Sequence, residues 1–201
     1  TQGPVVQSFE RAVADYVAAD HAVAVASGTA ALHLSLAALD IGPGHEVVVP
    51  TLTFIATANA VRMCGADPVF ADVEPTTCNI DPDSVQRVIT PRTRAVIIVH
   101  QFGLPADLLR LHAVADARGI PIIEDAACAL GSEYHGRRIG GCARLACFSF
   151  HPRKVITTGE GGMITTNDAQ IAERLHRLRH HGMDRSDWQR HHDSYSQRES
   201  Y

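Results

Sequence analysis

The sequence predicts an α/β fold with a mainly parallel sheet flanked by helices. Nearly continuous apolar runs of roughly four to seven residues are typical of strands that are buried on both faces of a sheet. A longer amphipathic segment follows most of these runs, and repeated strand–helix units favour parallel pairing. The chain has 201 residues, of which 45% are hydrophobic and 20% charged, so it can bury the core of one domain.

The expected strands and helices alternate along the chain. The order is strand 21–27, helix within 29–44, strand 46–50, helix within 53–65, strand 94–100, helix within 105–119 and strand 120–126. Two of these helices have an apolar face followed by a glycine, which is the usual residue just past a helix C-terminus. The faces are Leu32, Leu36 and Leu39 before Gly42, and Leu108, Leu111 and Ala115 before Gly119. Asp81 and Pro82 predict the cap and first residue of a shorter helix.

The segment SFHPRKVITTGEGG, residues 149–162, connects two further apolar runs that predict strands, 145–150 and 161–166. A flexible surface linker would explain its glycines but not the apolar runs on either side. We therefore expect structure on both sides of this loop to hold its lysine, Lys154, in place.

Charge and hydropathy narrow the possible partners. The formal net charge is -4 and the pI is near 6.3, which gives no electrostatic reason to expect nucleic acid or an anionic membrane surface as a partner. No apolar run approaches the roughly 18 residues that are needed to cross a bilayer. We expect a soluble, cytoplasmic protein that binds a small molecule.

Cysteine and histidine patterns do not predict a metal site. The five cysteines form no C-x-x-C pair, so free thiols are expected at Cys64, Cys78, Cys128, Cys142 and Cys147. The histidine pairs 180–181 and 191–192 are adjacent residues, and adjacent residues on a helix do not face the same way.

In open parallel sheets, ligands bind beyond the carboxyl ends of the strands. Ser27, Gly28, Thr29 and Ala30 follow the first expected strand and enter a helix, where free N–H groups form either a phosphate site or an ordinary helix cap. Asp125, after Glu124, ends another strand. Its carboxylate suits a helix cap, a metal ion or a cationic heterocycle.

Two more segments carry candidate residues, each with a simpler explanation. Phe54 opens an expected helix, where a phenylalanine is ordinarily part of the core. Ser149 and Lys154 follow a strand, and a loop lysine is ordinarily solvated. Taken together, a phosphate cradle, an aromatic ring, a strand-end aspartate and a lysine are the groups that hold pyridoxal 5'-phosphate.

These motifs, in this order, closely resemble the DegT/StrS family of sugar aminotransferases of fold type I. The resemblance rests on residues 26–61, GADPVFADV (65–73), IIEDAACALG (122–131) and FSFHPRKVITTGEGGMITT (148–166). It implies a three-layer sandwich and assigns residues 1–201 to the cofactor-binding large domain. Members of the family continue into a small C-terminal domain, so we expect this chain to lack that part.

The resemblance also implies a role for each candidate residue. Lys154 is similar to the Schiff-base lysine, which also moves protons, and Asp125 to the partner of the pyridine nitrogen. Phe54 matches the stacking aromatic. Cys128 stands where relatives more often have Gln or His near the phenolic oxygen, and a thiol is a weak hydrogen-bond partner. The expected phosphate-binding residues are Gly28, Thr29, Ala30 and Ser149.

The implied activity is transfer of an amino group from an amino acid, expected to be glutamate, to the keto group of a nucleotide-linked deoxysugar or related cyclic ketone. A homodimer is expected for the full-length protein. One alternative is a pyridoxamine-dependent sugar dehydratase, although such relatives have histidine in place of Lys154. A non-enzymatic binding or scaffold module is the second alternative. A nicotinamide-dependent dehydrogenase is disfavoured because no G-x-G-x-x-G run follows the first strand.

Overall fold

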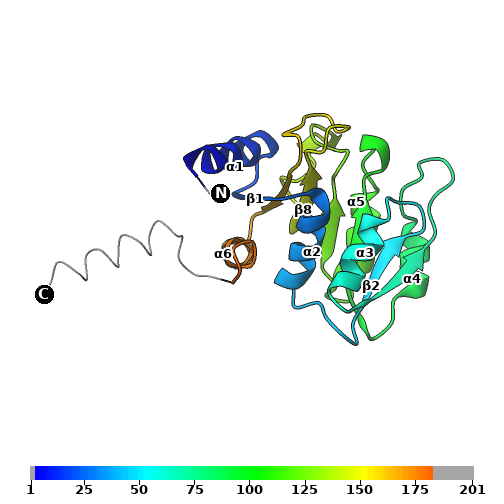
Figure 1. Cartoon of the computed structure of the whole chain (residues 1–201). Helices are drawn as coiled ribbons and strands as arrows, with labels where there is room; N and C mark the ends of the chain where they lie inside the picture. Colours follow the sequence, from blue (N-terminus) through cyan, green and yellow to red (C-terminus); the bar gives the residue numbers. More distant parts are fainter. Residues whose placement is uncertain (1–2, 183–201) are drawn as a thin grey trace, which may run out of the picture.

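A computed structural model describes residues 3–182 as helices packed on both faces of one sheet (Figure 1). Seven strands lie in the order β1-β9-β8-β5-β4-β2-β3. They are β1 (His21–Val25), β2 (Glu46–Pro50), β3 (Asp67–Ala71), β4 (Thr93–Val99), β5 (Ile122–Asp125), β8 (Leu145–Ser149) and β9 (Gly162–Thr166). In this sheet only β9 runs opposite to its neighbours, which confirms the mainly parallel fold class.

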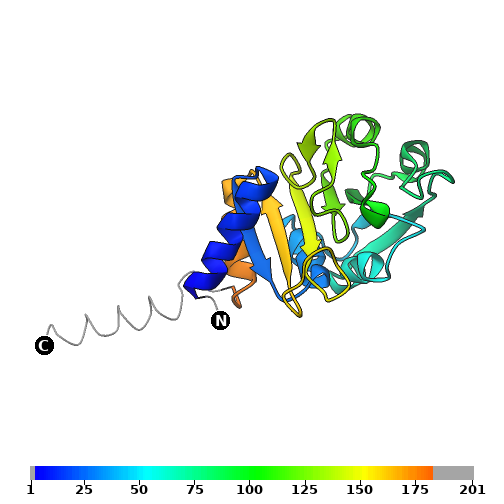
Figure 2. The same cartoon turned by 90° about the horizontal axis from the view of Figure 1, so that it is seen from above.

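The helices form the two outer layers. Figure 2 shows the sheet from above, between these layers. One face carries α2 (Gly28–Ala38), α3 (Ala56–Met63) and α6 (Ala169–Leu178), and the other carries α1 (Pro4–Val17), α4 (Pro82–Val88) and α5 (Leu108–Asp116). Beside α5 lie a 3-10 turn, Gln101–Gly103, and a hairpin of β6 (Glu133–Tyr134) and β7 (Arg137–Arg138). No helix among residues 3–182 is long and apolar enough to span a bilayer.

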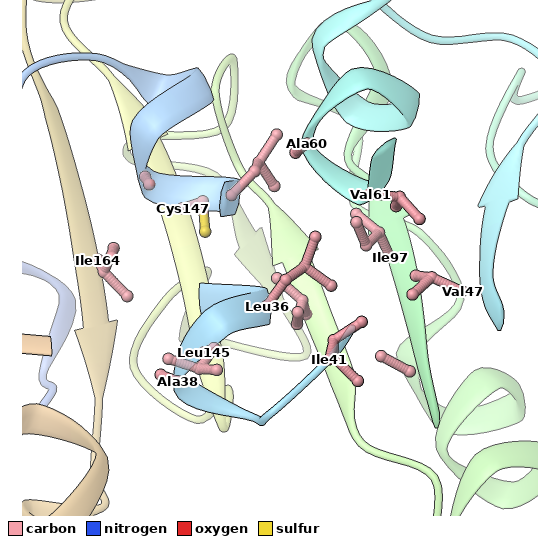
Figure 3. Close-up of a cluster of buried hydrophobic side chains, with 14 of the residues drawn as sticks. Leu36, Ala38, Ile41, Val47, Ala60, Val61, Ile97, Leu145, Cys147 and Ile164 are labelled. Atoms are coloured by element: carbon pink, nitrogen blue, oxygen red, sulfur yellow. The ribbon is translucent and has the colours of Figure 1, made fainter. Parts of the chain in front are cut away.

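The alternation of strand side chains builds a separate core on each face. Val47 and Ile97 point toward α2 and α3, where they meet Leu36 and Val61 (Figure 3). Val48, next to Val47 in sequence, points to the opposite face and packs with the α4 and α5 cluster. Each such side chain contributes about 1.5–3 kcal/mol when it is fully buried. The strands are therefore apolar on both faces, as the near-continuous runs predicted.

The helix ends follow the expected capping residues with one exception. Asp81 caps α4 through the N–H groups of Asp83 and Ser84. Gly119 takes the left-handed conformation after α5, with a φ of 64°. The prediction for Gly42 is wrong, because α2 ends earlier and Asp40 takes the positive φ instead. Aspartate tolerates this conformation better than most residues with a side chain.

The parallel strands bring the candidate residues to one edge of the sheet. The carboxyl ends of β1, β2, β4, β5 and β8 all lie there, because these strands run in the same direction. The segments that leave this edge contain Ser27 to Ala30, Leu52 to Phe54, His100 and Gln101, Asp125 to Cys128, and Ser149 to Lys154. The fold thus collects five loops from distant parts of the sequence.

Candidate active site

A cavity of about 320 Å³ lies at the carboxyl edge of β4 and β5. Four of the predicted site residues line it, namely Phe54, Asp125, Cys128 and Lys154. Its volume is at the lower end of the roughly 300–1,000 Å³ that is usual for small-molecule sites. Two further hollows, of about 380 and 510 Å³, lie beside α5 and contain none of the predicted site residues.

Lys154 is held inside this cavity by its loop. Its Nζ donates a hydrogen bond to Cys128 Sγ at 3.2 Å, and its backbone N–H binds His151 O at 2.9 Å. No other residue among these 201 is a lysine. The amine of Lys154 is therefore the one side-chain amine in the chain.

The two threonines after the lysine close the loop. Thr157 Oγ1 and the N–H of Thr158 both bind the carbonyl of Phe150, at 2.8 and 3.1 Å. Phe150 N–H in turn binds Gly161 O at 2.9 Å, and the Phe150 ring is buried. The loop is thus fastened to the core at its base, as the apolar runs on each side predicted.

Asp125 lies at the floor of the cavity and is only 6% exposed. Its Oδ1 accepts a hydrogen bond from Ala127 N–H at 3.2 Å, and its Oδ2 accepts one from Thr57 Oγ1 at 2.9 Å. Burial raises the pKa of this carboxyl, while the hydrogen bonds and the charges of His100 and Lys154 oppose the rise. A cationic partner beside this carboxyl would therefore favour its ionised form.

His100, which also lines this cavity, forms a buried pair with Glu124. Its Nδ1 accepts a hydrogen bond from Ala106 N–H at 3.1 Å, so the proton of a neutral imidazole lies on Nε2. That Nε2 then donates to Glu124 Oε2 at 3.1 Å. The backbone N–H of His100 also binds Asp125 O, so this pair fixes the end of β5 that carries the site carboxylate.

Phe54 is not part of the core, because 73% of it is exposed at the mouth of the cavity. Phe102 on the facing turn is 83% exposed and has a φ of 54°. The same segments and the lysine loop carry further exposed apolar side chains. We call Leu52, Phe54, Ile55, Phe102, Leu104, Val155 and Ile156 the apolar rim; each is at least 43% exposed.

The remaining predicted residues lie together at the start of α2, outside the set that lines the cavity. A Cβ added to Gly28 would lie 2.9 Å from Ser149 Cβ, so the first turn of α2 contacts the end of β8. Ala30 N–H is occupied by the helix cap Ser27 Oγ, at 3.1 Å. The N–H groups of Gly28 and Thr29 have no acceptor among residues 3–182. Ser27 therefore caps the helix, and the N–H groups of Gly28 and Thr29 are still available to a ligand.

Sequence reasoning missed Thr53, Thr57, His100 and Gln101 at this site. Thr53 and Thr57 are four residues apart, and their hydroxyl oxygens lie 2.8 Å apart. The Thr-x-x-x-Thr spacing in an expected helix start was the available signal. Among the described residues no group of three His, Cys, Asp or Glu side chains could hold a metal ion, and residues 191–192 lie outside them.

Comparisons with known proteins agree with this geometry. The profile of the DegT/DnrJ/EryC1/StrS aminotransferase family matches residues 1–197. The chain is similar to GDP-perosamine synthase of Caulobacter vibrioides, with 49% identity over 182 residues, which are 90% of this chain and 49% of that protein. It spans about half the length of the curated relatives that it matches.

Solved structures show the same likeness. DesV of S. venezuelae, in complex with a ketimine intermediate, superposes with a TM-score of 0.90 at 46% identity, over 92% of this chain and 50% of that one. DesI in the presence of its TDP-sugar product superposes with a TM-score of 0.87 at 43% identity, over 92% of this chain and 46% of that one. The PLP form of Spr1654 from Streptococcus pneumoniae superposes with a TM-score of 0.85 at 33% identity, over 89% of this chain and 51% of that one.

Proposed function

Because the chain belongs to the DegT/DnrJ/EryC1/StrS aminotransferase family, we propose that the intact protein is a pyridoxal phosphate-dependent aminotransferase acting on a nucleotide-linked keto sugar. The observation that carries this proposal is the meeting of Lys154 and Asp125 in one cavity. A lone surface lysine and a lone capping aspartate would have no reason to face the same hollow.

The residues present fit pyridoxal phosphate. Gly28 leaves no space for a side chain next to Ser149, so the first turn of α2 and the Ser149 hydroxyl lie close together. The free N–H groups of Gly28 and Thr29, at the positive end of α2, suit a phosphate. The exposed Phe54 ring is available to stack on the heterocycle. We assign Ala30 a supporting role in this turn and Cys128 a place beside the ring.

Bound pyridoxal phosphate supplies an electron sink for the substrate carbon that exchanges its amino group. The chain supplies the group that attaches the cofactor and the group that sets the protonation of its ring nitrogen. Lys154 Nζ would hold the cofactor covalently, and the same amine would serve as the base and acid for the proton at that carbon. The Asp125 carboxylate would pair with the ring nitrogen and keep it protonated. Because Asp125 is almost completely buried, water would be kept away from that contact.

The substrate class follows from the relatives. One is named GDP-perosamine synthase, and another was solved with a TDP-sugar product. We infer a keto group on a nucleotide-linked deoxysugar, or on a related cyclic ketone, as the acceptor and an amino acid, expected to be glutamate, as the donor. We also infer a homodimer, because the apolar rim consists of seven large exposed apolar side chains on the segments that contribute to the cavity.

Covalent trapping tests the assignment directly. The protein is mixed with pyridoxal phosphate, reduced with borohydride, digested and analysed by mass spectrometry. Because Lys154 is the single lysine here, we expect one labelled side chain and a visible absorbance band that changes when glutamate is added. Lys154→Ala should lose both signals, and Lys154→Arg, which keeps the positive charge, should lose them too. An unlabelled Lys154 in folded protein would refute the proposal.

Activity of the intact protein tests the substrate class. We expect amino sugar to form when nucleotide-linked keto sugars are supplied with glutamate and pyridoxal phosphate, followed by chromatography of the products. A protein that labels at Lys154 but aminates no member of such a panel would contradict the sugar assignment alone. That result would favour a binding or scaffold role.

A further inference from the structure

Two threonine hydroxyls connect the cavity wall to the Asp125 carboxylate. Thr57, the second residue of α3, is completely buried, and its Oγ1 lies 2.9 Å from Asp125 Oδ2. Thr53, in the loop before α3, lines the cavity, and its Oγ1 lies 2.8 Å from Thr57 Oγ1. The line Thr53, Thr57, Asp125 therefore runs from the cavity wall to its floor.

The chemistry of a hydroxyl fixes the direction of this line. A threonine hydroxyl has one proton to donate and two lone pairs that accept. Thr57 donates its one proton to Asp125 Oδ2, so it must accept from Thr53. Each donor polarises the next, which strengthens the bond to the charged oxygen.

Thr57 does not use its hydroxyl to build the helix. Its backbone N–H binds Phe54 O at 3.1 Å, and the hydroxyl contacts only Thr53 and Asp125 among the described residues. A structural threonine at a helix start would cap a backbone N–H. The Thr57 hydroxyl instead donates its hydrogen bond to the Asp125 carboxyl group.

Other groups also act on Asp125. His100 from the end of β4 and Lys154 from its loop are the charged or titratable groups that favour the ionised form, and Ala127 N–H binds the second oxygen. Cys147 on β8 is buried nearby and its thiol is held neutral, because burial raises its pKa. Thr57 is the only side chain among residues 3–182 that donates a hydrogen bond to the carboxylate.

We propose that Thr57, backed by Thr53, is a positioning residue that keeps the Asp125 carboxylate ionised and oriented for the ring nitrogen of the cofactor. The part that concerns the ring rests on the proposed function. The part that concerns Asp125 is a property of the cofactor-free protein and can be measured there.

The main experiment measures the ionisation of Asp125 by NMR. Cofactor-free protein labelled with [γ-13C]aspartate is titrated with acid, and the Asp125 signal is assigned by its absence in Asp125→Asn. Thr57→Val keeps the shape of threonine and removes the hydroxyl. We expect the pKa of Asp125 to rise by about one unit, a roughly tenfold change in proton affinity, because a hydrogen bond to a charged group is lost.

Three variants make the result specific. Thr57→Ser keeps the hydroxyl and should return the Asp125 titration to that of the wild type. Thr93→Val removes the hydroxyl of a buried threonine near the opposite end of the sheet, whose Oγ1 binds Thr90 N–H, and should leave the Asp125 titration unchanged. Thr53→Val removes the outer donor and should shift the titration in the same direction as Thr57→Val but by less. If Thr57→Val does not fold, Thr53→Val provides the NMR test in its place.

A cofactor readout completes the test. In Thr57→Val the affinity for pyridoxal phosphate, followed by visible absorbance, should fall several-fold as pH decreases over a range in which the wild type is unaffected. An Asp125 titration that is the same in folded Thr57→Val and wild-type protein would overturn the proposal. If pyridoxal phosphate does not label Lys154 in wild-type protein, the proposed function is refuted, and the NMR result for Asp125 is unaffected.

Discussion

Burial raises the pKa of the Asp125 carboxyl above its ordinary value of 3.8, and this has a consequence for stability. Between the unfolded and the folded pKa, the folded protein holds a proton that the unfolded chain has lost. The contribution of Asp125 to stability is therefore fully present below the unfolded pKa and is lost as pH rises through the folded pKa. Above its folded pKa the carboxyl becomes a buried charge, which the protein interior disfavours.

Replacing this carboxyl should stabilise the cofactor-free protein. In Asp125→Asn the new amide would accept from Ala127 N–H and donate to Thr57, whose hydroxyl can rotate. We expect a higher free energy of unfolding than wild type at neutral pH, and a difference that disappears toward about pH 4. Urea unfolding at several pH values measures it. A gap of equal size at every pH would show that packing, and not ionisation, is responsible.

Cys128 offers a second test at the residue level. It is exposed, lines the cavity and lies 3.2 Å from Lys154 Nζ, whereas Cys147 is buried with a raised thiol pKa. Iodoacetamide should therefore modify Cys128 and spare Cys147. The added group would fill the space beside Lys154, so labelling of Lys154 by pyridoxal phosphate should be lost.

The other exposed thiol is a matched control for this reaction. Cys142 lies by the β6–β7 hairpin, where Arg137 Nη1 contacts its sulfur at 3.5 Å, and it does not line the site cavity. After iodoacetamide, Cys128→Ser should still attach pyridoxal phosphate and Cys142→Ser should not. Prior loading with cofactor should protect Cys128. If Cys128→Ser loses attachment like the wild type, the cysteine does not border the cofactor.

Residue types at strand ends predicted the main groups of this site, but not how those groups are supported. Phe54, Asp125 and Lys154 could be named because each follows an apolar run, and parallel strands end at one edge. Cys128 was named only through the family resemblance. Thr57 escaped notice because its role depends on where the start of α3 lies relative to the end of β5. Val61 of α3 and Ile97 of β4 belong to one buried cluster, and sequence spacing does not connect them.

At the level of elements, an ion pair joins the end of α6 to α1. Arg179 Nη1 contacts Glu10 Oε1, and both side chains are 10% exposed. The pair also provides hydrogen-bond partners for the backbone of β1. Glu10 accepts from Ala24 N–H at 2.8 Å, and Arg179 donates to Ala24 O at 3.1 Å. Two helices on opposite faces of the sheet are thus linked around its edge strand.

Removing one partner should be costly. Glu10→Ala leaves the buried Arg179 charge without a counter-ion and Ala24 N–H without an acceptor, so we expect a loss of about 3–5 kcal/mol in unfolding free energy. Asp67→Ala breaks the exposed pair with Arg62 and should cost about 1 kcal/mol or less. Urea unfolding compares the two variants. Equal small losses would show that the Glu10 pair is solvated in solution.

The elements with strong local patterns were predictable, and those defined by tertiary contacts were not. Residues 46–50 and 94–100 have uniform apolar runs, and both became central strands. β3 was missed because it is a half-exposed edge strand that contains Pro68, which a central strand would not tolerate. The reversed direction of β9 follows from the lysine loop turning back on itself, which no periodicity records.

At the level of the whole molecule, the apolar rim is the feature that the described fold leaves uncovered. Its seven side chains come from the segments before α3, after β4 and after β8, and three of them, Leu52, Phe54 and Phe102, line the cavity. Exposed apolar groups scattered singly are ordinary, but several on the segments that form one cavity are typical of an interface. A second copy of the protein that covers this rim would also close the site against water.

Phe102 is the best position to test that interface. It is 83% exposed and has a φ of 54°, a conformation that asparagine adopts more readily than phenylalanine. Phe102→Asn should therefore weaken the proposed dimer of the intact protein while leaving the monomer as stable as before or slightly more so. Leu109→Asn, at a 66% exposed apolar position on α5 outside the rim, should leave the dimer unchanged. Sedimentation over a range of concentrations, with urea unfolding of each variant, separates these effects. Dissociation by Leu109→Asn but not by Phe102→Asn would place the interface on the α5 face and leave the cavity mouth open.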